Sequence, residues 1–262
     1  MDLNLAGKRA LVCGSSQGIG LAAAQALSAL GAAVTLVARD KQKLEAAAGT
    51  LAATQGQKHN TLAADFAEPE VLQNSVRRLV EDQGSFQILV NNTGGPPPGP
   101  AHTADTDAYL DGFRKHLLCN QLLVQTLLPG MRASGYGRIV NIISTSVREP
   151  ITGLGVSNTI RGAVASWAKT LATELGSDGI TVNNVLPGFT DTSRLGLLIH
   201  SRAEKAGVDD AEIAAGMRAQ VPLGRFADPR EVGDAIAFLC TPAAAYINGV
   251  SLAVDGGRTR SI

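Results

Sequence analysis

Three glycines near the N-terminus have the spacing of a phosphate-binding turn. The segment CGSSQGIG, residues 13–20, follows an apolar run and opens a helical pattern, which is the setting such a turn requires. Glycine lets the backbone approach a pyrophosphate, and the start of a helix offers free N–H groups. The segment predicts a dinucleotide site; the alternative is a tight turn without a ligand. The expected contacts are Gly14, Ser15, Ser16, Gln17, Gly18, Ile19 and Gly20.

A serine and an arginine share one face of a helical pattern in the middle of the chain. Ser157 and Arg161 are four residues apart, so their side chains lie one turn apart on the same side. Arginine stays charged and carries five donors, whereas a serine hydroxyl is too weak an acid to exchange protons readily alone. His116 could exchange protons, because histidine titrates near neutral pH; the alternative is a packed or surface histidine on a long helix.

These residues are spread over alternating apolar runs and longer helical patterns. Such alternation predicts an α/β protein with a parallel sheet covered on both faces, a three-layer doubly wound architecture. No repeat or linker interrupts it, so we expect one domain over residues 1–262. The expected strands are 9–14, 33–38, 60–65, 86–92, 138–144, 180–186 and 250–256, and the expected helices are 18–30, 40–54, 69–83, 105–133, 156–177 and 228–240.

Two segments need a separate interpretation. Residues 187–227 form the one long irregular region, and a region of this length in a compact protein is usually a lid or a binding loop. Residues 21–38 carry no charge over a length that a membrane helix would need. Because Gly31 interrupts this stretch and its second part is β-branched, we expect a buried helix followed by a buried strand.

Composition limits the class of protein. The chain has 262 residues, 45% hydrophobic and 18% charged, with a formal net charge of zero. No Lys/Arg-rich run appears, so a nucleic-acid partner is not expected. The cysteines, at positions 13, 119 and 240, are far apart and odd in number, which favours buried thiols in a reducing compartment over a metal site or disulfides. With no secretory signal visible, we expect a cytoplasmic protein that does not span a membrane.

Four motifs resemble those of the short-chain dehydrogenase/reductase family. The glycine spacing resembles its TGxxxGxG fingerprint with Cys13 in place of the threonine, and NNTG, PGFTDT and GVSLAVDGG resemble three later motifs in order. The resemblance covers essentially the whole chain. It implies a seven-stranded Rossmann sheet, a nicotinamide cofactor, a small-molecule carbonyl or alcohol substrate, and a homotetramer or homodimer. Members are often labelled 3-oxoacyl-carrier-protein reductases; for this chain that label is an analogy.

The residues after the second expected strand favour NADP over NAD. An NAD site usually has an acidic residue there, whereas this chain has Ala38 followed by Arg39, whose guanidinium can grip a 2′-phosphate. Arg39 could instead be an ordinary surface arginine. The resemblance also implies that Asp65 contacts the adenine and Thr192 the nicotinamide amide. The remaining cofactor contacts implied by the motifs are Asn91, Gly94, Pro187 and Gly188.

The resemblance also shows an altered catalytic set. The family uses an Asn-Ser-Tyr-Lys tetrad, and its spacing places Ser144 at the serine, Ser157 at the tyrosine, Arg161 at the lysine and His116 at the asparagine. Only Ser144 matches. Two functions stay open: an NADP-dependent oxidoreductase with a non-standard proton donor, for which His116 is the candidate, and a catalytically silent NADP-binding sensor or structural subunit. No metal is expected in either case.

Overall fold

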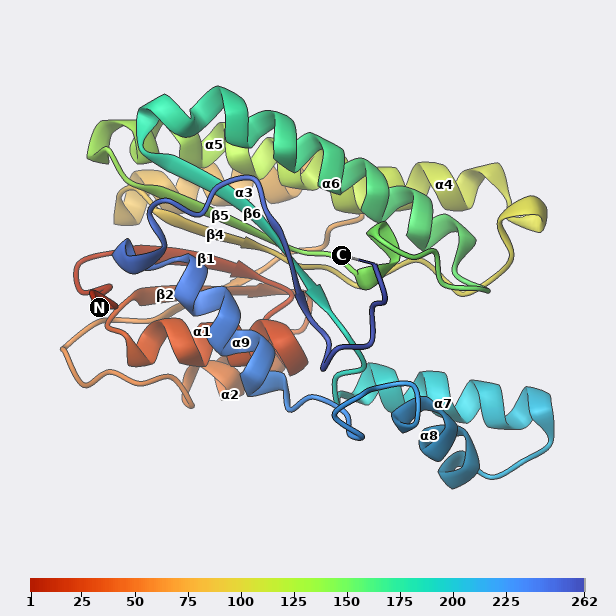
Figure 1. The fold of residues 1–262 in the computed structure, drawn as a ribbon. Coiled ribbons are helices and arrows are strands. Elements are labelled where there is room, and N and C mark those ends of the chain that lie inside the picture. Colours follow the sequence, from red (N-terminus) through yellow and green to blue (C-terminus); the bar gives the residue numbers. More distant parts are fainter. Residues whose placement is uncertain (262) are drawn as a thin grey trace.

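A seven-strand sheet lies between two layers of helices (Figure 1) in the computed structural model, which describes residues 1–261. All neighbouring strands are parallel, in the order β3-β2-β1-β4-β5-β6-β7. The predicted doubly wound fold and all seven predicted strands are confirmed. The strands are β1 (Arg9–Cys13), β2 (Ala33–Ala38), β3 (Asn60–Ala63), β4 (Ile88–Asn91), β5 (Gly137–Ile142), β6 (Ile180–Pro187) and β7 (Ser251–Val254).

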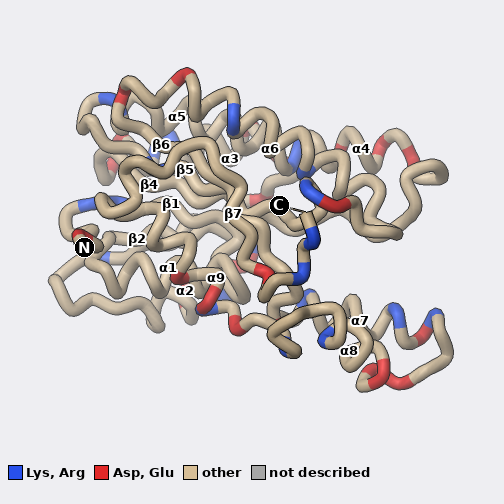
Figure 2. The backbone as a smooth tube through the Cα atoms, in the orientation of Figure 1, with Lys and Arg blue, Asp and Glu red and all other residues tan. Residues whose placement is uncertain are grey.

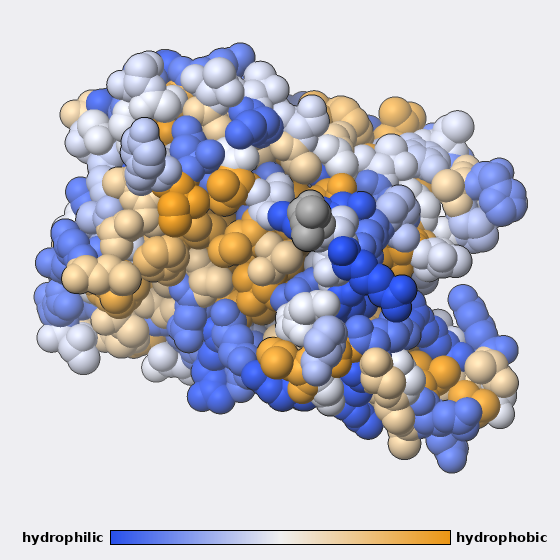
Figure 3. Space-filling view, in the orientation of Figure 1, coloured by the Kyte–Doolittle hydropathy of each residue, from blue (hydrophilic) through white to orange (hydrophobic). Residues whose placement is uncertain are grey.

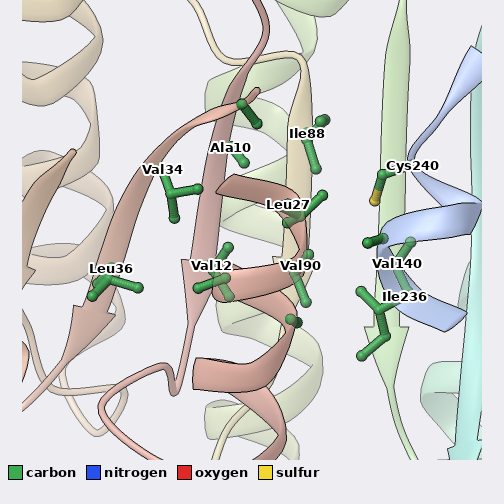
Figure 4. Close-up of a cluster of buried hydrophobic side chains, with 14 of the residues drawn as sticks. Ala10, Val12, Leu27, Val34, Leu36, Ile88, Val90, Val140, Ile236 and Cys240 are labelled. Atoms are coloured by element: carbon green, nitrogen blue, oxygen red, sulfur yellow. The ribbon is translucent and has the colours of Figure 1, made fainter. Parts of the chain in front are cut away.

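Each face of the sheet has its own apolar core. One core joins the sheet to α1 (Gly18–Ala29), α2 (Lys41–Ala48) and α9 (Pro229–Leu239); ten of its residues are labelled in Figure 4. The other joins the sheet to α3 (Pro69–Gln83), α5 (Cys119–Ser134) and α6 (Gly155–Leu175). Burial on both faces explains why the strands read as continuous apolar runs. All three cysteines are buried and free, as predicted.

The uncharged stretch at residues 21–38 lies mainly in the core formed with α1, α2 and α9. It contains most of α1, a turn at Gly31 with φ +98°, and β2, so the predicted helix, glycine stop and buried strand are confirmed. Within residues 1–261, no helix is both long and apolar enough to cross a membrane.

The helix expected at residues 105–133 is not regular. It consists of α4 (Thr106–Phe113), a π-helical segment (Arg114–Leu118) and α5. The wider turn of a π-helix is rare and often occurs at functional sites. Here it carries His116.

The region expected to be irregular, 187–227, contains two helices. These are α7 (Ser193–Ala206) and α8 (Asp210–Arg218), so the prediction that this region is irregular is wrong, and its role as a lid or binding loop stays a prediction. Leu195, Ile199 and Met217 form a small apolar cluster between them, separate from the two main cores. Figure 1 shows both helices projecting beyond the ends of the strands. Their apolar faces are short, so the sequence pattern did not indicate them.

The order of the strands decides where a ligand can lie. From β1 the chain builds the sheet outward to β2 and β3, and then returns to place β4 on the other side of β1. In an open parallel sheet, ligands bind at this switch point, beyond the carboxyl ends of the strands. The segments that follow β1, β4, β5 and β6 meet at that edge.

A row of polar side chains crosses four strands inside the sheet. The Asn91 Nδ2 donates to Asn141 Oδ1 at 2.8 Å, the Asn141 Nδ2 to Asn184 Oδ1 at 3.0 Å, and the Asn184 Nδ2 to Ser251 Oγ at 3.1 Å. Each of these pairs is also a register pair of neighbouring strands. We call this row the asparagine ladder.

Candidate active site

A cavity of about 230 Å³ opens at the carboxyl ends of the strands. Its walls come from the segments after β1, β4, β5 and β6 and from the starts of α6 and α7. The structure thus brings together residues from distant parts of the chain. The predicted site residues that line the cavity are Ile19, Ser144, Ser157, Arg161, Pro187, Gly188 and Thr192.

The glycine turn lies beside this cavity and has the backbone that a phosphate site requires. Gly14 and Gly18 have φ of +57° and +60°, a region that favours glycine. A Cβ on Gly20 would lie 2.2 Å from the Gly14 carbonyl oxygen, so only glycine fits there. Helix α1 begins at Gly18, which leaves its first N–H groups free to meet an anion.

The far end of the turn touches the start of α7. The Gln17 side chain donates to the Ser193 hydroxyl at 3.2 Å, and a Cβ on Gly18 would lie 3.3 Å from a carbon of Thr192. Thr192 itself caps α7 by accepting from the Leu195 N–H. A dinucleotide along this edge would therefore meet both segments, as the sequence predicts.

Two predicted cofactor contacts have structural partners instead. The Ser15 hydroxyl donates to the Val12 carbonyl at 2.7 Å and accepts from the Val37 N–H at 3.0 Å, so it ties β1 to β2. Asn91 is buried and forms the first rung of the asparagine ladder. Its neighbour Asn92 lines the cavity instead, because alternate residues at a strand end point to opposite sides. Both side chains therefore already have partners within the sheet, and the two residues stay predicted as cofactor contacts.

The residues expected around the adenine end are exposed at the ends of β2 and β3. Arg39 follows β2 directly and forms no ion pair within residues 1–261. Asp40 turns to α2, where its carboxylate accepts from the Lys43 N–H. Asp65 follows β3, exposed. The guanidinium of Arg39 is thus free to meet a phosphate.

Ser144, Ser157 and Arg161 converge on the cavity from β5 and α6. Ser157 and Arg161 lie one helical turn apart and are each only 8% exposed. The Arg161 Nη1 donates to the Ile142 carbonyl at 2.8 Å, which ties α6 to the end of β5. Burial and the nearby charge of Arg194 lower the pKa of Arg161 to about 10, so it remains charged at neutral pH.

His116 does not have the ionisation expected of it. It is 3% exposed, and burial, together with the charge of Arg161, lowers its pKa to about 2. The side chain is therefore neutral at physiological pH. Its Nε2 is buried and has no partner within residues 1–261. The prediction of a proton donor that titrates near neutrality is corrected, because both causes disfavour the imidazolium form.

Three further cavity residues were not singled out from the sequence as site residues. Asn92 binds the Gly14 carbonyl through its Nδ2 at 3.1 Å and so joins the ends of β4 and β1. Arg194, on the first turn of α7, and Arg258, in the C-terminal segment, also line the cavity. The motif NNTG contained the signal for Asn92; nothing local to either arginine marked it.

A glycine turn at the switch point of a doubly wound parallel sheet defines a dinucleotide-binding protein of the Rossmann class. The chain belongs to the short-chain dehydrogenase/reductase family: residues 14–259 match a family model described as enoyl-(acyl carrier protein) reductase. The resemblance seen in the sequence is confirmed.

Relatives and solved structures of this family cover nearly the whole chain. A 3-oxoacyl-(acyl-carrier-protein) reductase of Vibrio cholerae is 33% identical over 97% of this chain and 98% of its own. Gluconate 5-dehydrogenase of Gluconobacter oxydans is 30% identical over 99% and 97%. The structure of L-sorbose reductase from Gluconobacter frateurii, complexed with NADPH and L-sorbose, superposes with a TM-score of 0.93 at 32% identity, covering all of both chains.

Proposed function

We propose that the protein is an NADP-dependent oxidoreductase that acts on a carbonyl/alcohol pair with an altered catalytic set. The observation that carries this proposal is the convergence of Ser144, Ser157 and Arg161 on one cavity beside the glycine turn and Thr192. The known relatives support the reaction class, and the NADPH of L-sorbose reductase supports the cofactor.

Each residue of the altered set has a role that its chemistry allows. A bound nicotinamide supplies or accepts the hydride. Ser144 and Ser157 orient the substrate oxygen by hydrogen bonds, and Arg161 donates to the nicotinamide ribose while its Nη1 stays on Ile142. The titratable side chains that line the cavity are arginines, and His116 is neutral. The proton therefore comes from water, held by the two serines.

The cofactor preference is tested by binding. NADPH should bind more tightly than NADH, because Ala38 leaves room for a 2′-phosphate and Arg39 forms no ion pair within residues 1–261. Arg39→Ala should weaken NADPH by about 1.5–3 kcal/mol and leave NADH unchanged, measured by fluorescence titration. Arg78→Ala, an exposed arginine on α3, is the matched control. Equal affinities in the parent protein would reject the preference.

A second function is favoured by one observation. Arg161 makes a structural bond between α6 and β5, and within residues 1–261 the titratable side chains that line the cavity are arginines. A catalytically silent NADP-binding sensor or structural subunit requires a cofactor site but no proton donor in the cavity. The two functions differ in one measurement: NADPH consumption by the parent protein over a panel of carbonyl compounds. Consumption would reject the silent function; tight NADPH binding without consumption would support it.

A further inference from the structure

The cavity collects positive charge without a compensating carboxylate. Within residues 1–261, Arg161, Arg194 and Arg258 line it, and no aspartate or glutamate does. None of the three forms an ion pair in that part of the chain. Figure 2 shows Lys and Arg positions along the C-terminal segment and on α7, in a protein whose formal net charge is zero.

Two of these arginines are close enough to repel one another. The charge of Arg194 lowers the pKa of Arg161, and both charges act on His116. Arg194 reaches across from α7 to the segment after β4: its Nη2 lies 2.6 Å from the place where a Cβ on Gly95 would stand. Glycine at position 95 thus makes room for the guanidinium. Like charges held together in this way are stabilised when an anion binds between them.

The third arginine is held in place at the cavity wall. The Arg258 guanidinium lies 4.3 Å over the ring of Phe189, and its Nη1 donates to Thr145 at 3.4 Å. Its Nε is buried without a partner within residues 1–261. Glu149, which lines the adjoining cavity, accepts from the backbone N–H groups of Arg260 and Ser261 and pairs with none of the three arginines.

Apolar side chains form much of the rest of the wall, beside asparagine, serine and threonine side chains. Ile143, Ile151, Leu154, Phe189 and Leu198 line the cavity. An apolar wall with a few convergent donors is typical of a site for a small molecule with one strongly polar end.

We propose that the substrate carries an oxyanion, either a carboxylate or a phosphate. This group binds at Arg194 and Arg258, in the cavity that the buried Arg161 also lines. This inference rests on the proposed oxidoreductase function. Ribose hydroxyls are neutral and leave the charge of Arg161 uncompensated, and the cofactor pyrophosphate has its own site at the glycine turn. Guanidinium groups match both oxyanions in geometry.

The experiment measures binding of small probes to the protein saturated with NADP⁺. Benzoate and benzamide share a ring and differ in charge, and phenyl phosphate tests the other oxyanion. By calorimetry, benzoate or phenyl phosphate should bind at least about tenfold more tightly than benzamide, because a charge-assisted hydrogen bond contributes that much. Whichever of the two binds more tightly identifies the oxyanion.

Two variants and one control locate the site. Arg194→Gln should remove most of the preference for the oxyanion, and Arg258→Gln provides a second variant if the first fails to fold. Lys205→Gln, an exposed residue on the same helix, should leave the preference intact. Affinity for NADP⁺ should change by less than about threefold in each variant.

Three outcomes would overturn the inference. The oxyanions could bind no better than benzamide, Arg194→Gln and Arg258→Gln could leave the preference unchanged, or the variants could lose NADP⁺ affinity instead, which would assign the arginines to the cofactor. A parent protein that binds neither NADP⁺ nor NADPH would reject the proposed function separately. The same titration without cofactor would then still decide whether the cavity binds oxyanions.

Discussion

Burial decides the charge of two basic side chains, Arg161 and His116. Arg161 remains a cation because its pKa, lowered to about 10, still lies above neutrality, whereas His116, with a pKa of about 2, does not ionise. The same low-dielectric surroundings thus keep one residue as a charged donor and the other as a neutral one. Arginine at the position of the family's lysine keeps its charge in this buried place, since a guanidinium holds its proton more strongly than an ammonium group.

The neutral histidine predicts a loss of stability in acid. The unfolded chain binds a proton at His116 near pH 6.5, but the folded chain binds it only near pH 2. Between these values the unfolded state holds more protons, so the free energy of unfolding falls as the pH drops below 6.5, by up to about 1.4 kcal/mol per pH unit.

Denaturation with urea between pH 7.5 and about pH 4.5 checks this expectation. His116→Asn should reduce the dependence on pH, and His102→Asn, at an exposed position, should not. An unchanged dependence in His116→Asn would contradict the assignment of a buried, neutral histidine.

Restoration of the family pair tests whether the cavity can use a positioned acid. Ser157→Tyr together with Arg161→Lys places a phenol and an ammonium group on the cavity side of α6. A positioned acid contributes a factor of about 10²–10⁴ in rate, so the double variant should gain carbonyl reductase activity over the parent. Ser157→Phe with Arg161→Lys is the matched control, because it lacks only the hydroxyl. Equal activity in the two double variants would show that the cavity does not use this acid.

Helices α1 and α9 pack so closely that one glycine is required between them. A Cβ on Gly233 would lie 2.7 Å from the Ala22 carbonyl carbon, and no side chain can yield there because the contact is with backbone. Gly233→Ala should lower the free energy of unfolding by about 1–3 kcal/mol, as overpacking does. Gly216→Ala, on α8 with open space around its Cα, should instead raise it by up to about 1 kcal/mol. Thermal or urea denaturation of both variants measures the difference; destabilisation by both would contradict this account.

The main elements could be predicted because long patterns specify them. Seven apolar runs separated by helical patterns fixed the sheet and its layers, and the glycine turn marked the edge where the site lies. Helices α7 and α8 were missed, because their stability depends on a cluster that includes Phe189 and Phe226, contributed by the flanking segments. The identity of the side chains facing the cavity also depended on contacts between distant segments, which explains why the partners of Ser15 and Asn91 and the burial of His116 could not be predicted.

At the scale of the whole molecule, one face is suited to assembly. β7 is the edge strand of the sheet, and Leu252 on it is 38% exposed, with Val250 and Tyr246 exposed nearby in the chain. Figure 3 shows apolar side chains gathered on the face that carries β7. Exposed apolar surface of this kind marks interaction sites. We expect a homodimer or a homotetramer at micromolar concentration, measured by light scattering.

A charged substitution tests whether this face is used. Leu252→Lys should shift the mass toward a smaller assembly, since burial of an unpaired ammonium group is unfavourable. Leu197→Lys, at a more exposed leucine on α7, is the control and should leave the mass unchanged. A monomeric parent protein would refute the expectation of assembly, and an unchanged mass in Leu252→Lys would place the interface elsewhere.

The asparagine ladder has a consequence for how the sheet finds its alignment. Strands that are apolar on both faces have no alternation of apolar and polar residues that would specify their register. A shift in register between neighbouring strands therefore costs little buried apolar area. The asparagine ladder specifies the register, because its side-chain hydrogen bonds form only when Asn91, Asn141, Asn184 and Ser251 are paired across neighbouring strands. A slip by one residue displaces a strand end by roughly 3.3 Å. Ser144 lies just after β5 and Pro187 is the last residue of β6, so such a slip would displace two walls of the cavity relative to each other. The four polar side chains inside the sheet therefore help to set the distances between residues at its edge.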